Sequence, residues 1–241
     1  MKRLLSIFAI LSLMTLSVQA VVDIPSTNAN YDVIYHWGLI NKVAGHGNVS
    51  FHTDGNEFMG TLEGKSIPWE GRIYTVESSL SAIFVPSKSG PSQEIVTGMQ
   101  GVYTKPKVGE IGDFPFKNIY GDGTLDASPE TMEAVNVMTQ MISMFYYAKD
   151  IDFASLQPGA HLVIPIQRGN STQSLYVSYL GQSNYSYGDY STPVYKIVFR
   201  YTFNGAPDRY PVTCLIGRYN RMPVQFSADL LIGHIKMCYV P

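Results

Sequence analysis

The chain has few charged residues and only two cysteines. Asp, Glu, Lys and Arg together make up 15% of its 241 residues, and the formal net charge at pH 7 is -2. Because no cluster of basic side chains could neutralise a row of phosphates, we expect no nucleic-acid partner. The low charge content also argues against an intrinsically disordered chain.

The sequence lacks the short motifs that mark common active sites. It contains no Gly-x-Ser-x-Gly elbow, no His-Glu-x-x-His pair, no phosphate-binding Gly-rich loop with Lys, and no Cys-x-x-Cys. A triad can still assemble from distant residues. The candidates for its base are His36, His46, His52, His161 and His234. We predict no catalytic residue among them, because a single histidine on a strand is more often satisfied or exposed.

No convincing metal site is present in the sequence either. His46 and His52 could share one face of a strand, but Gly47 would disturb the register and no third ligand is evident. The acidic residues between 122 and 130 do not match a calcium-binding loop, and acids are expected at the start of a helix. We therefore predict neither a metal nor a cofactor.

A long apolar run occurs only at the N-terminus. Residues 1–3 are Met, Lys and Arg, residues 4–18 are apolar apart from single Ser and Thr residues, and residues 18–20 are Val, Gln and Ala. A basic start, an apolar stretch and small residues before a cleavage point are typical of a secretory signal peptide. The run is shorter than the roughly 20 residues that span a bilayer.

The signal peptide predicts where the protein functions. Neither cysteine directly follows the cleavage point, so we expect no lipid anchor there. We predict that residues 1–20 are removed and that residues 21–241 form a single domain without a transmembrane segment. The expected location is the periplasm or the cell exterior.

Two cysteines in an exported chain are a candidate disulfide, because the compartment is oxidising. The alternation of residues places Cys214 on an apolar strand face and Cys238 on a more polar one, and we expect another strand between them. A bridge needs Cα atoms within about 7 Å of each other. The bonded and the reduced states both remain open.

The abundant residues favour a β fold. Tyr occurs 17 times and Gly 21 times, which is typical of turn-rich pleated structure. Asp54, Gly55 and Asn56 predict a tight hairpin, and Gly45 and Gly47 a bulge. The main predicted strands are 31–39, 43–52, 57–64, 73–84, 161–167, 173–185, 192–203, 210–217, 222–227 and 230–240.

One helix is predicted, from Pro129 to about Lys149. Ser128 is a good N-cap, and Pro129 suits the first helical position because its missing N–H would be unpaired anyway. Two neighbouring apolar stripes leave only a narrow polar edge, so most of the helix must be covered. We therefore predict a mainly β fold in which a strongly curved antiparallel sheet, or open barrel, wraps one central amphipathic helix.

Aromatic side chains are the feature most open to a functional interpretation. They could stack on sugars or line an apolar groove. The predicted ligand-binding residues are Trp37, Trp69, Tyr176, Tyr179, Tyr185, Tyr187 and Tyr190. The alternative is that tyrosine simply suits half-buried strands.

Several segments resemble an exported bacterial family, the domain of unknown function numbered thirty-one zero-eight. The similar segments are residues 35–39, 145–149, 156–159, 176–181, 220–224 and 231–236. The resemblance implies an all-β envelope protein, typical of Bacteroidetes, with a curved-sheet fold called YmcC-like. It implies no established activity and no catalytic residues.

We interpret the chain as a non-enzymatic exported protein whose concave, aromatic-lined surface binds a lipid, glycan or envelope partner. The first alternative is a hydrolase of envelope polymers, which needs one histidine close to both a carboxylate and a Ser or Thr. The second alternative is a structural subunit of an envelope assembly, which would expose a large apolar patch.

Overall fold

The computed structural model describes the greater part of the chain after the predicted signal peptide. The described residues are 27–67, 75–87, 90–104, 111–113, 141–168, 170–203, 206–207, 211–229 and 233–241. The predicted signal peptide and residues 129–140 of the predicted helix lie outside them. The division into one domain and a signal peptide therefore stays a prediction. Within the described ranges, no helix has the length and apolarity that a membrane crossing requires.

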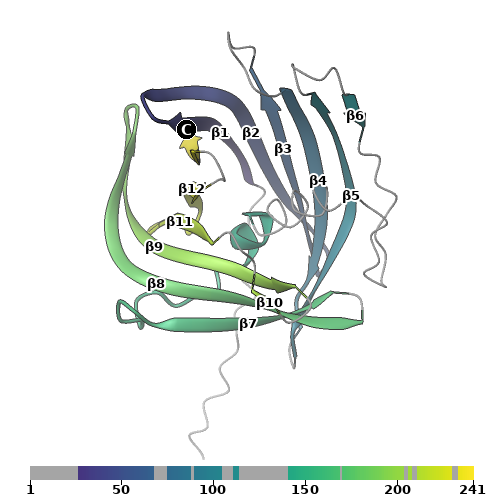
Figure 1. Cartoon of the computed structure of the whole chain (residues 1–241). Helices are drawn as coiled ribbons and strands as arrows, with labels where there is room; N and C mark the ends of the chain where they lie inside the picture. Colours follow the sequence, from purple (N-terminus) through teal and green to yellow (C-terminus); the bar gives the residue numbers. More distant parts are fainter. Residues whose placement is uncertain are drawn as a thin grey trace, which may run out of the picture.

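The described residues form one sheet of thirteen strands (Figure 1). The strands are β1 (Thr27–Trp37), β2 (Ile40–Asp54), β3 (Glu57–Ser66), β4 (Thr75–Val85), β5 (Ser92–Thr104), β6 (Ile111–Asp113), β7 (His161–Arg168), β8 (Ser171–Tyr187), β9 (Tyr190–Phe203), β10 (Ala206–Pro207), β11 (Val212–Gly217), β12 (Pro223–Asp229) and β13 (His234–Val240). Their order is β10-β9-β11-β12-β13-β1-β2-β3-β4-β5-β7-β8, and β6 pairs with β5.

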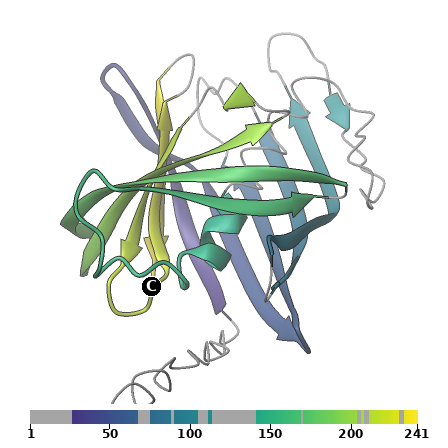
Figure 2. The same cartoon turned by 90° about the horizontal axis from the view of Figure 1, so that it is seen from below.

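The sheet closes on itself, because β8 also pairs with β9. Eleven strands make up the resulting ring. An odd ring of alternating strands must contain one parallel contact, and this is β5 beside β7, where Ser92 pairs with Ile166 and Gln93 with Gln167. In Figure 2 the green strands β7 to β9 run across the view, at a steep angle to the blue strands, which shows how strongly the sheet curves. The predicted mainly β fold with a curved antiparallel sheet is confirmed, but the predicted open barrel is instead a closed ring.

Local sequence explains most strand ends. Gly55 has a φ of +59° in the two-residue turn between β2 and β3, where Asp54 pairs with Glu57. The predicted strand 31–39 is too long at its C-terminal end, because Gly38 adopts a φ of +56° and turns the chain after Trp37. The predicted bulge is present between β1 and β2, where the register shifts after Val33.

Aromatic rings fill the inner face of the ring. Along β3, Phe58 and Leu62 are buried and alternate with more exposed residues, as expected for a sheet with one face in the core. Phe51 of β2 stacks on Phe58 with ring centroids 4.7 Å apart, and Phe58 lies 6.3 Å from Phe84 of β4. Neighbouring strands therefore contribute one continuous aromatic layer.

A short helical segment, residues 141–147, packs on this layer and is buried along its whole length. Phe145 lies 5.2 Å from Phe51 and 5.6 Å from Phe226 of β12, measured between ring centroids. Tyr146 stacks on Phe84 at 4.8 Å. The segment thus contacts strands from several parts of the ring. The predicted wrapping of the whole helix stays a prediction, since its first half is outside the described residues.

Candidate functional site

Three of the predicted ligand-binding tyrosines gather at the tip of the β8–β9 hairpin. Tyr187 pairs directly with Tyr190, and Tyr185 precedes Tyr187 by two residues, so all three lie on one face of the hairpin. That face of the hairpin packs against β13. The Tyr190 ring lies 5.3 Å from the ring of Tyr239 on β13, and Tyr185 lies 6.2 Å from Tyr190.

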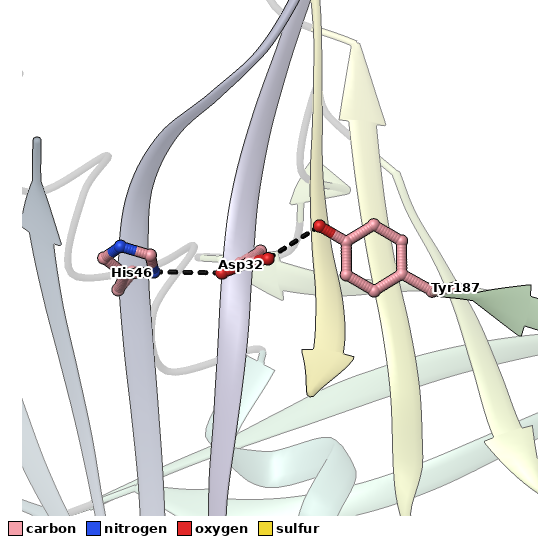
Figure 3. A network of polar contacts seen from close by, with 3 residues as sticks. All are labelled: Asp32, His46 and Tyr187. Carbon is pink, nitrogen blue, oxygen red and sulfur yellow. Dashed lines mark hydrogen bonds and ion pairs between the residues drawn. The ribbon is translucent and has the colours of Figure 1, made fainter. Parts of the chain in front are cut away.

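A polar network joins the hairpin tip to β1 and β2 (Figure 3). The Tyr187 hydroxyl donates to Asp32 Oδ2 at 2.6 Å, and His46 Nδ1 lies 2.9 Å from Asp32 Oδ1. Asp32 and His46 are directly paired residues of β1 and β2, so the register places their side chains side by side. One carboxylate thus receives two donors from two different elements.

Burial favours the protonated hydroxyls of Tyr185 and Tyr187. Burial, followed by the hydrogen bond to Asp32 and its charge, raises the pKa of Tyr187 to about 12. Burial, with contributions from Cys238, raises the pKa of Tyr185 even further. Tyr187 is therefore a hydrogen-bond donor at neutral pH and not a nucleophile.

The network differs from a hydrolase triad in one respect. In a triad, the hydroxyl is hydrogen-bonded to the imidazole. Here the Tyr187 hydroxyl is hydrogen-bonded to Oδ2 of Asp32, and His46 is bonded to Oδ1 of the same carboxylate. His46 is mostly exposed, with 62% of its side-chain surface accessible to solvent. The arrangement is suited to fixing the hairpin tip on β1.

The two cysteines are free, and both are buried. Cys214 of β11 pairs with Phe226 of β12, and Cys238 of β13 pairs with Gln225. Because Gln225 and Phe226 are consecutive and directly paired residues share a face, the two sulfurs point to opposite faces of the sheet. The expected intervening strand is β12, and the structure has no Cys214–Cys238 bond.

The other predicted ligand-binding residues lie apart from the hairpin tip. Tyr179 of β8 is buried, with its ring 5.9 Å from Phe153. Tyr176 of β8 is on the outer face and is 38% exposed. Trp69 and the side chain of Trp37 lie outside what the structure describes. The seven predicted residues therefore do not form one described surface.

The remaining histidines lie at separate places on the ring. His161 of β7 is hydrogen-bonded to Ser178 of β8, with 2.9 Å between Nδ1 and Oγ. His234 of β13 is bonded to Asp229 of β12 at 2.7 Å. His36 and His52 are exposed on β1 and β2. In the part of the chain that the structure describes, no three His, Cys, Asp or Glu side chains are grouped closely enough to hold a metal ion.

Sequence reasoning missed Asp32, which is the centre of the network. Its partner Tyr187 is 155 positions away in the chain, so no local pattern connects the two residues. Arg221 lies in the turn between β11 and β12, as its sequence predicts, but its φ of +57°, unusual for a non-glycine residue, was not predicted. Its guanidinium lies 5.4 Å from the Phe153 ring and donates to the Ile151 carbonyl, which supports the turn before β12.

Among solved structures, the chain is similar to one titled "Crystal Structure of Beta-barrel-like Protein of Domain of Unknown Function DUF1849 from Brucella abortus". The two are 11% identical, with a TM-score of 0.42, over 89% of this chain and 95% of the other. The strand pairing of this chain, and not that likeness, defines its fold. No family model matches the chain, and no curated protein matches it. Its resemblance to the thirty-one zero-eight family remains a prediction.

Proposed function

We propose that this protein is an exported, non-enzymatic binding protein of the cell envelope. In this proposal, residues 1–20 are cleaved, the ring of strands wraps the whole helix 129–149, and the outer face of β7 to β9 binds a partner. The partner classes are a lipid, a glycan or an envelope protein, and an anionic phospholipid surface fits best. The observation that carries the proposal is an exposed apolar group on that outer face.

The exposed group follows from the register of β7 and β8. Leu162 and Ile164 pack against the core, so Val163 between them points outward. Val163 pairs directly with Tyr176, and their exposed fractions are 55% and 38%. Leu180, at the bulge of β8, is 47% exposed. Val163 and Tyr176 adjoin directly, and Leu180 lies four residues further along β8. Exposed apolar residues that adjoin on a sheet are more informative than scattered ones.

Positive charges border the apolar group. Arg200 of β9 pairs directly with Tyr176, and Lys196 pairs with Gly181, the residue after Leu180. Both cations are exposed. A Lys or Arg close to an anionic bilayer contributes about 1 kcal/mol of attraction, and tyrosine favours the interface between lipid and water. Apolar side chains beside cations therefore suit an anionic lipid surface better than a neutral glycan.

The side chains on the inner face of the ring are less accessible to a partner than those on the outer face. The aromatic rings that line it are buried against each other and against residues 141–147. A ligand entering there would have to displace packed rings, each of which contributes roughly 1.5–3 kcal/mol through burial. We therefore assign partner binding to the outer face and a stabilising role to the rings.

Vesicle co-sedimentation tests the proposal. We expect the protein to sediment with vesicles that contain phosphatidylglycerol, and less with phosphatidylcholine alone. The double variant V163S/Y176S removes apolar contact area worth at least 1.4 kcal/mol, which lowers partitioning about tenfold. Tyr219→Ser is the matched control, because Tyr219 is 84% exposed but lies on the turn between β11 and β12.

Native mass spectrometry of protein purified from its own periplasm separates the partner classes. Retained phospholipid supports the proposal. A retained glycan or protein subunit, or sedimentation of the double variant that equals wild type, contradicts the lipid assignment. Turnover of an envelope polymer that depends on His46 would contradict the non-enzymatic assignment.

A further inference from the structure

Two histidines from strands that are far apart in sequence face each other at one end of the sheet. The register pairs Asp229 of β12 with His234 of β13, and His234 with His36 of β1. Directly paired residues of antiparallel strands point to the same face, with Cβ atoms about 4.5–5.5 Å apart. His36 and His234 are therefore cross-strand neighbours on one face of the sheet, and Asp229 lies beside His234.

We propose that His36 and His234 bind a divalent transition-metal ion of the Zn²⁺ class, with Asp229 as a positioning residue. Imidazole nitrogen is a preferred ligand of Zn²⁺, Cu²⁺ and Ni²⁺. The proposal is independent of the lipid-binding face, which lies on β7 to β9.

The contact of Asp229 prepares His234 for a metal. His234 Nδ1 lies 2.7 Å from Asp229 Oδ1, and a carboxylate can only accept, so Nδ1 carries the proton. Nε2 then presents its lone pair. Metal-binding histidines usually donate their other ring N–H to a carboxylate in this way, which fixes the tautomer and raises ligand basicity. The His234 side chain is 30% exposed, so an ion can reach it from solvent.

The backbone beside the site allows a close approach. Gly233, directly before His234, has a φ of +87°. A Cβ at this position would lie 2.6 Å from the carbonyl oxygen of His36 and 3.0 Å from the Tyr35 ring. Only glycine therefore lets the start of β13 lie this close to His36.

The chain contains an internal control for the proposal. His46 also has a carboxylate on its Nδ1, since Asp32 lies 2.9 Å away. Its cross-strand neighbours are Asp32 and Lys65, so no second imidazole faces it. A metal that needs two imidazoles should bind at His234 and not at His46.

The charges around the site predict a moderate affinity. Lys236 follows His234 by two residues and is exposed on the same face, so its charge opposes a cation. The carboxylate of Asp229 offsets that charge. Two imidazoles leave the remaining coordination positions to water.

Calorimetric titration of the untagged full chain with ZnCl₂ tests the site. We expect one ion per chain, and affinity at least about tenfold weaker in His36→Gln and in His234→Gln. Asp229→Ala keeps both ligands and should weaken binding about tenfold through loss of the positioning contact. His46→Gln should bind like wild type. Far-ultraviolet circular dichroism checks that each variant is folded.

Pulsed electron paramagnetic resonance with Cu²⁺ gives a readout that does not depend on stability. The spectrum of the wild type should show two coordinated imidazoles, and that of each single histidine variant should show one. The proposal is overturned if wild type binds no Zn²⁺, or if either His36→Gln or His234→Gln binds as tightly as wild type. Loss of binding in His46→Gln alone would also overturn it.

Discussion

Asp32 accepts hydrogen bonds from two side chains that reach it from different strands. The Tyr187 hydroxyl and His46 Nδ1 occupy its two oxygens, at 2.6 and 2.9 Å. The carboxylate therefore has a structural role, which is to hold the tip of the β8–β9 hairpin on β1. His46 was identifiable from sequence as a candidate, but its partner was not, because strand register decides which residues meet.

Replacing Tyr187 with Phe should destabilise the fold by about 1 kcal/mol. This value is lower than that of a fully buried hydrogen bond to a charged group, because water can reach the half-buried Asp32. Urea unfolding of Tyr187→Phe against wild type measures the change. Tyr219→Phe, at an exposed position, should unfold like wild type. Equal midpoints for Tyr187→Phe and wild type would show that the contact contributes nothing.

The raised pKa of Tyr187, caused by burial and by its hydrogen bond to Asp32, predicts a loss of stability at high pH. The pKa of Tyr187 is about 12 in the folded chain, against 10.0 for an ordinary tyrosine. Because the pKa of Tyr187 is higher in the folded chain, this hydroxyl loses its proton first in the unfolded chain. The contribution of Tyr187 to the free energy of unfolding is therefore present below pH 10 and is lost as pH rises towards 12. Unfolding midpoints measured between pH 9 and 12 should fall more steeply for wild type than for Tyr187→Phe. Parallel curves would contradict this assignment.

At the level of single elements, local sequence predicts the strands well. Alternation locates β3, β8 and β9, and the turn residues locate the hairpin at Gly55. The predicted 230–240 strand is wrong at residue 233, because Gly233 has a φ of +87° and β13 starts at His234, and residues 230–232 lie outside the described residues. Such boundaries depend on backbone conformation, which a hydrophobic pattern does not encode.

Gly55→Ala should destabilise the β2–β3 hairpin by about 1 kcal/mol, because an L residue is strained at a φ of +59°. Nothing lies within 4 Å of a Cβ at this position, so the effect is conformational and not steric. Thermal unfolding measures it. Gly90→Ala is the control, because its nearest neighbour would be 3.7 Å away and its φ is not positive. A Gly55→Ala midpoint equal to that of wild type would refute the strain.

At the level of the whole molecule, closure of the ring could not be predicted from sequence. The ring needs both the β8–β9 pairing and a short parallel pairing that joins Ser92 and Gln93 of β5 to Ile166 and Gln167 of β7. Parallel neighbours arise from the count and order of strands, and neither is visible in a local pattern. The composition could predict only that apolar and aromatic residues suffice for a large core.

The two cysteines lie on opposite faces of the sheet, which predicts that both remain reduced thiols. Both thiols should resist a thiol reagent in the native protein, because Cys214 and Cys238 are buried and burial raises the pKa of each. After unfolding in guanidinium, two thiols per chain should react. Ellman's reagent on protein purified without reductant measures both states. A single oxidised mass, with no thiols released on unfolding, would contradict the opposite-facing placement.

In the proposed function, the packed interior supports an outer face that binds a partner. Methyl NMR of the protein titrated with anionic bicelles distinguishes binding on the outer face from binding inside the ring. Val163 and Leu180 are on the exposed outer face, whereas Ile142 is fully buried on the helical segment. We predict that the methyl signals of Val163 and Leu180 shift or broaden while those of Ile142 stay unchanged. Shifts at Ile142 with unchanged Val163 and Leu180 signals would place the ligand inside the ring and rule out binding on the outer face.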